Sequence, residues 1–64
     1  MTARQTMVLD ELKAVGSFGT TAASIAYSVD APEPSIRRTI QELIRLGHNI
    51  SYAADGIYRY RAGY

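Results

Sequence analysis

Apolar residues recur at helical spacing over residues 3–46 of the chain. Such spacing gathers them on one face of each helix, and that face then packs against the core. Three segments show the pattern, and they predict helices over residues 3–15, 21–29 and 33–46. The positions expected to form one shared core are Val8, Leu12, Ile25, Val29, Ile36, Ile40 and Leu43.

The ends of the predicted helices carry residues that helix termini favour. Thr21 is placed to cap the second helix, because its hydroxyl can accept a hydrogen bond from a free amide of the first turn. Pro32 and Pro34 bracket the start of the third helix, where a missing amide donor costs little. Gly16 and Gly47 follow the first and third helices, and Gly47 is expected to be left-handed.

From residue 50 the apolar positions alternate with polar ones, which is typical of strands. Residues 50–61 are therefore predicted to form a hairpin. The predicted fold class is α+β, mostly α, with three helices followed by a two-stranded β-hairpin in a single domain over residues 1–64.

Two registers of this hairpin are possible. A two-residue turn at Asp55-Gly56 would pair Tyr52 with Arg59, whereas a three-residue loop with a left-handed Gly56 pairs Tyr52 with Tyr58. The second register places the large side chains on one face, so burial favours it over the local turn preference. Its other face then holds Ser51, Arg59 and Arg61.

Two aromatic residues lie outside these patterns. Phe18 is expected in the core, because a lone phenylalanine is rarely left exposed in so small a domain. Tyr27 lies on the outer side of the second helix, where it is either an ordinary exposed tyrosine or a contact to phosphate or to a partner.

The third helix has a polar face opposite its apolar stripe. At about 100° per residue, Arg38, Gln41 and Arg45 point outward, with Arg37 on one flank. A short helix, a tight connection and a longer helix with arginines outside are the parts of a helix-turn-helix, whose second helix enters the major groove. The alternative is that the arginines are only the solvated side of an amphipathic helix.

These residues resemble the winged helix-turn-helix family, and most closely the amino-terminal DNA-binding domain of biotin ligase repressors. The resemblance is carried by Thr21, Ile25 and Val29, by the SIRRTIQEL sequence of residues 35–43, by Leu46 and Gly47, and by Gly56 and Tyr58. It implies a winged helix in which residues 17–20 form a brief strand beside the hairpin, or wing. The family's usual serine or threonine cap on the recognition helix is Pro32 here, and Ser35 is the candidate to replace its phosphate contact.

Charge is unevenly distributed along the 64 residues, whose formal net charge is only +1. Residues 1–30 carry two basic and three acidic side chains, whereas residues 31–64 carry five basic and three acidic ones. All five basic residues of the second part are arginines, which suit bidentate contacts with guanine or phosphate. The positive charge thus gathers in the elements that would face DNA.

Several functions are excluded by what the sequence lacks. It has no cysteine and one histidine, His48, so no cysteine-rich zinc site or histidine cluster is expected. Its serines have no recognisable base, and Asp10 and Glu11 are expected to be solvated. We therefore expect no enzyme, no cofactor and no small-molecule ligand. In the absence of a long apolar run we expect a cytoplasmic protein, nucleoid-associated when bound to DNA, and no membrane contact.

The sequence predicts a small sequence-specific protein that binds double-stranded DNA and acts as a transcriptional regulator or as an architectural or excision-type factor. Its size and type suggest a phage or mobile element as the source. The candidate DNA contacts are Ser35, Arg37, Arg38, Gln41 and Arg45 in the recognition helix and Ser51, Arg59 and Arg61 in the wing.

The alternative is a winged helix that binds a protein, as an inhibitor or adaptor of a transcription or replication enzyme. The low net charge favours it, as do the acidic Glu33 at the start of the third helix and the outward Tyr27. One domain of this size reads only a short DNA site.

For the DNA-binding function we therefore expect a monomer or weak homodimer in free solution that pairs on DNA.

Overall fold

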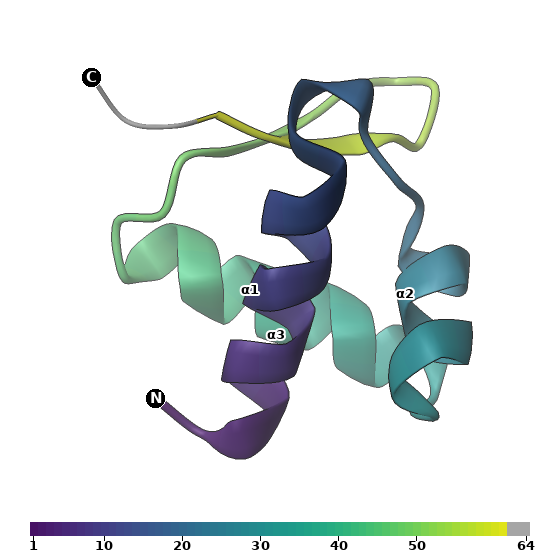
Figure 1. Ribbon diagram of the computed structural model, residues 1–64, viewed down its shortest axis with the longest axis vertical. Coiled ribbons are helices and arrows are strands. Elements are labelled where there is room, and N and C mark those ends of the chain that lie inside the picture. The colour runs from purple at the N-terminus through teal and green to yellow at the C-terminus, as the bar shows by residue number, and fades with distance from the viewer. Residues whose placement is uncertain (62–64) are drawn as a thin grey trace.

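The computed structural model describes residues 1–61, and its elements follow the predicted order (Figure 1). They are α1 (Ala3–Val15), a 3-10 helix η1 (Gly16–Phe18), α2 (Ala22–Val29), α3 (Glu33–Arg45), β1 (Ile50–Tyr52) and β2 (Tyr58–Tyr60). The two strands are antiparallel. The chain is thus α+β and mostly α, as predicted, and its layout is consistent with a winged helix. Within residues 1–61 no helix combines the length and the apolar character that a membrane span requires.

The first two helices begin at side-chain caps. Thr2 and Gln5 form a reciprocal capping box on α1: the Gln5 amide donates to the Thr2 hydroxyl at 3.1 Å, and the Thr2 amide donates to the Gln5 side-chain oxygen at 2.9 Å. Thr21 caps α2, as predicted, by accepting from the Ser24 amide at 3.1 Å. Both caps satisfy amides that the helices themselves leave without a partner.

The third helix begins and ends differently. Pro32 precedes it without any side-chain cap, so backbone geometry and Pro34 in the first turn set its start. The helix ends at Arg45, one residue earlier than predicted. Gly47 follows in the left-handed conformation expected for it, with φ at 98°.

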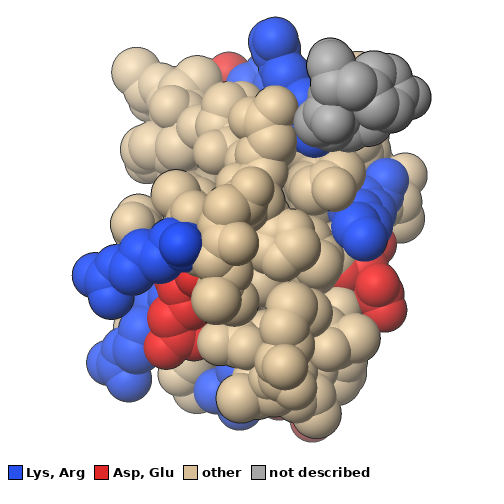
Figure 2. Space-filling view, turned by 90° about the vertical axis from the view of Figure 1, so that its left-hand side faces the viewer, with Lys and Arg blue, Asp and Glu red and all other residues tan. Residues whose placement is uncertain are grey.

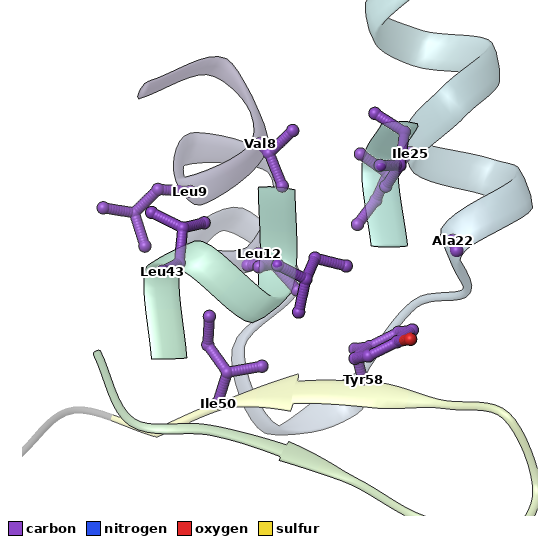
Figure 3. Close-up of a cluster of buried hydrophobic side chains, with 10 residues drawn as sticks. Val8, Leu9, Leu12, Ala22, Ile25, Leu43, Ile50 and Tyr58 are labelled. Carbon is purple, nitrogen blue, oxygen red and sulfur yellow. The ribbon is translucent and has the colours of Figure 1, made fainter. Parts of the chain in front are cut away.

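The core lies where the three helices meet one face of the hairpin (Figure 3). Six of the seven predicted core residues belong to it, whereas Val29 is only partly buried and packs against its edge. Thr39 is also buried. Its hydroxyl donates to the Ser35 carbonyl at 2.9 Å, so the polar group has a hydrogen-bond partner without water. The apolar core consists of Val8, Leu9, Leu12, Ala22, Ile25, Ile36, Ile40, Leu43, Ile50 and Tyr58.

The hairpin has the register with the three-residue loop. Tyr52 pairs with Tyr58, and Gly56 in the loop is left-handed with φ at 82°. Ile50 and Tyr58 are buried against the helices, as the predicted register requires. Tyr52 lies on the same face but is 62% exposed, and its ring centroid is 4.7 Å from that of Tyr58.

The prediction that Phe18 lies in the core is wrong. Its side chain is 79% exposed, because it sits in the short η1 turn between two glycines with positive φ, Gly16 and Gly19, while Tyr58 closes the core at this place. Of the strand implied for residues 17–20, only Thr20 is paired. Its amide donates to the Tyr58 carbonyl at 2.9 Å, and the Tyr58 amide donates to the Thr20 carbonyl at 2.8 Å.

Replacing Ile40 tests which face of α3 is buried. The Ile40 side chain is fully buried, so we expect Ile40→Ala to lower the free energy of unfolding by about 2–5 kcal/mol, close to the whole stability of so small a domain. Ile44→Ala removes the same atoms from a side chain that is 37% exposed and should cost much less. Urea unfolding of both variants measures the difference, and equal losses would contradict the observed face.

Replacing Gly19 tests how closely the chain approaches the hairpin. A Cβ atom there would lie 2.4 Å from the Ile57 Cγ2 atom, on a backbone with φ at 91°. Gly47 has a similar φ but open space around it. We expect Gly19→Ala to destabilise by more than about 1 kcal/mol and by clearly more than Gly47→Ala, which meets backbone strain alone. Thermal unfolding monitored by circular dichroism compares the two variants. Equal effects would mean that the Ile57 side chain moves away from the added Cβ atom at no measurable cost.

Candidate nucleic-acid interface

The outer face of α3 carries the polar side chains that the sequence placed there. Ile36, Ile40 and Leu43 are 0% exposed, which fixes the rotation of the helix about its axis. Three exposed side chains lie on the opposite side, three to four residues apart, so they are neighbours on the surface. This α3 row consists of Arg38, Gln41 and Arg45.

Arg37 lies on the flank of α3, and its side chain pairs with another residue of the same helix. It forms an ion pair with Glu33, one turn earlier, and both side chains are substantially exposed. Exposed pairs of this kind contribute only about 0–1 kcal/mol. Glu33 therefore partly neutralises Arg37 but holds it weakly enough for another anion to compete.

Arg59 is engaged in the same way at the tip of the hairpin. Its guanidinium lies 3.4 Å from the Asp55 carboxylate, which also accepts a hydrogen bond from the Ile57 amide at 3.0 Å. The Ile57 amide is the main cause that lowers the pKa of Asp55, and Arg59 adds to it. The carboxylate is thus held in its charged form beside the arginine.

The hairpin separates its own polar residues from the α3 row. Figure 3 shows Ile50 and Tyr58 pointing from the strands toward the helices. Ser51 and Arg59 alternate with them and pair with each other, so they lie on the outer face of the hairpin, and the exposed Arg61 follows β2. The predicted wing contacts therefore form a second surface and do not extend the α3 row.

Two surface hollows flank α3. The α1 hollow lies between the first turn of α1 and α3, and the wing hollow lies between α3, the start of α2 and the hairpin. Residues lining the α1 hollow are Thr2, Ala3, Arg4, Ser35, Arg38, Thr39 and Glu42. Those lining the wing hollow are Thr21, Ala22, Ala23, Glu33, Arg37, Tyr52, Gly56 and Tyr58.

The hollows show where two candidate residues lie, and they bring a further arginine, Arg4, beside the α3 row. Ser35 is half-buried beside α1, and Arg37 lies on the opposite flank, beside the wing. Arg4 was not among the candidates, because only the packing of α1 on α3 brings it beside Arg38. No local pattern in the sequence signals this neighbourhood.

Charge on the surface is divided into small groups. Figure 2 shows basic side chains in separate places on the face it displays, several of them next to acidic ones, with uncharged surface between them. This division agrees with the two ion pairs and with the formal net charge of +1. Attraction to a polyanion would therefore depend on a few well-placed arginines and little on the overall charge.

Comparison of the chain with models of known families, with curated proteins and with solved structures found no match.

Removing the Arg59 side chain tests what stabilises the Asp55 carboxylate. A lowered pKa contributes stability above the ordinary value of 3.8, and this stability is lost as the pH falls through the lowered value. We expect Arg59→Ala to raise the pKa of Asp55 only part of the way, because the Ile57 amide is the larger cause. A carboxyl titration followed by NMR measures it, and full return to the ordinary value would assign the whole effect to Arg59.

Proposed function

We propose that this chain is a winged helix protein that binds duplex DNA in a sequence-specific manner, with α3 as its reading helix. The observation that carries the proposal is the α3 row, in which three exposed polar side chains lie opposite a fully buried stripe. Arginine can bond bidentately to guanine, and glutamine to adenine, in the major groove. Arg38, Gln41 and Arg45 are thus the right groups, in a row, to read base edges.

The shape around α3 supports this mode of binding. The helix has 13 residues, and the hollows on its two sides leave it as a ridge. A helix with its side chains is about 10–12 Å across, close to the roughly 12 Å width of the major groove. The ridge therefore has the width that insertion into the groove requires.

The proposed action is occupation of a DNA site. Bound there, the protein would regulate transcription by excluding other proteins, or it would help to assemble a larger complex as an architectural or excision-type factor. One domain of this size covers a short site, so specificity is gained when two copies bind adjacent half-sites. We propose a monomer or weak homodimer in free solution that pairs in this way on DNA.

A protein-binding role is the second candidate. Phe18 and Tyr27 are 79% and 90% exposed, and exposed aromatic residues often anchor protein interfaces. Glu33 and Asp55 reduce the positive field by pairing with arginines. Salt dependence separates the two functions, because binding to DNA weakens with salt at a log-log slope of about 0.9 per neutralised phosphate.

Arg38→Ala is the central test of the reading helix. We expect it to weaken binding to the preferred duplex by about 1–3 kcal/mol and to relax the preference at one base pair. The fold should remain intact, because the side chain is exposed. Arg37→Ala should weaken binding less, since Glu33 already engages that arginine.

The measurement begins with selection of bound sequences from random duplexes and continues with titration of the selected site. Lys13→Ala is the matched control, because it removes an exposed positive charge from the last turn of α1. If the Arg37→Ala/Arg38→Ala double variant binds the selected site as the parent does, α3 is not the reading helix. Binding that is absent or insensitive to salt would favour the protein-binding role.

A further inference from the structure

We infer that the α1 hollow is a seat for one backbone phosphate of the duplex, with Arg4 as its cationic contact and the base-reading Arg38 at its border. This inference rests on the proposed function and extends it. It adds Arg4, a residue of α1, to an interface otherwise formed by α3.

The hollow brings together two guanidinium groups from different helices. Arg4 comes from the first turn of α1, and Arg38 comes from the outer edge of α3. The hydroxyl-bearing Thr2 and Ser35 line the same hollow, whereas the hydroxyl of Thr39 already donates to the Ser35 carbonyl. Planar guanidinium groups bind phosphate oxygens bidentately, and hydroxyl groups can donate to the same oxygens.

Gln5 holds the two walls of the hollow together. Its side-chain oxygen accepts from the Thr2 amide at 2.9 Å, and its side-chain nitrogen donates to the Glu42 carboxylate at 3.1 Å. One amide group thus ties the start of α1 to the flank of α3. Arg4 and Arg38 are therefore carried by elements with a fixed separation, which reduces the ordering needed when an anion binds.

Glu42 limits where the anion can lie. Its carboxylate is the one acidic group among the lining residues, against the two arginines. The hydrogen bond from Gln5 engages it at the α1 side of the hollow. A phosphate is therefore expected beside Arg4, away from the repelling carboxylate of Glu42.

The position of the hollow matches the geometry of a major groove. A helix that fills the groove has a phosphate backbone along each of its flanks. The flank of α3 that bears Ser35 and Glu42 faces the α1 hollow, and the opposite flank, with Arg37, faces the wing hollow. With the α3 row on the bases, the α1 hollow thus lies beside one of the two strands.

A phosphate contact has a signature that a base contact lacks. Phosphates are the same at every base pair, so loss of Arg4 should weaken binding to selected and scrambled duplexes by the same factor. It should also reduce the log-log slope of affinity against salt by about 0.9. Arg38→Ala should in contrast change the sequence preference.

The experiment titrates parent, Arg4→Ala, Arg4→Lys and Lys13→Ala proteins onto selected and scrambled duplexes over a range of salt concentrations. Lys13→Ala removes one positive charge elsewhere on α1, and Arg4→Lys keeps the charge while removing the planar fork. We expect the slope to fall in Arg4→Ala alone. Circular dichroism confirms that each variant is folded, which is expected because both side chains are exposed.

A second measurement locates the phosphate. Methylphosphonate groups, which carry no charge, replace the phosphates of the selected duplex one at a time. We expect one replacement beside α3 to weaken the parent clearly more than Arg4→Ala, because the variant has already lost the ion pair that the replacement removes.

The outcomes separate this inference from the proposed function. If the parent binds DNA and Arg38→Ala weakens it, but Arg4→Ala keeps the parent's affinity and slope, the phosphate seat is wrong and the function stands. The same holds if Lys13→Ala reduces the slope as much as Arg4→Ala, or if Arg4→Ala changes the base preference. If the parent shows no salt-dependent binding to any duplex, both proposals are overturned.

Discussion

The burial of one stripe of α3 is the constraint on which the rest of the structure depends. Ile36, Ile40 and Leu43 are completely removed from water, and each such burial contributes about 1.5–3 kcal/mol. A rotation of α3 about its axis would expose this stripe and would bury Arg38 at a far greater cost. The same packing therefore orients the polar row, brings α1 beside α3 and creates the two flanking hollows.

Much of the fold could be predicted because its determinants are local. Thr21 begins a helix with its own hydroxyl, and Gly47 follows one in a conformation that glycine favours. The hairpin register was predictable because only one alignment of Tyr52 and Tyr58 gathers the large side chains on one face. The outward face of α3 followed from its buried stripe, so the three residues of the α3 row were predicted to lie together.

The remaining features depend on contacts between elements, which no local pattern records. Phe18 lies in a turn of three residues, too short to show a period that would reveal its exposure. The pairing of Arg59 with Asp55 depends on how the hairpin loop folds back. From the alternation of polar and apolar residues alone, the Arg59 side chain would be predicted to be free to bind DNA. Arg4 joins the candidate interface only because α1 packs against α3.

The pairing of Thr20 with Tyr58 has a consequence for how this domain can vary. Thr20 is bonded to the hairpin in both directions, and the next residue, Thr21, caps α2. The strand pair and the start of α2 thus share one rigid joint, without any linker between them. Insertions or deletions in β2 would shift α2 as well, whereas residues 53–55 at the hairpin tip lie beyond this joint. Homologous chains should therefore differ in length at the hairpin tip and keep a constant length from Tyr58 to Tyr60.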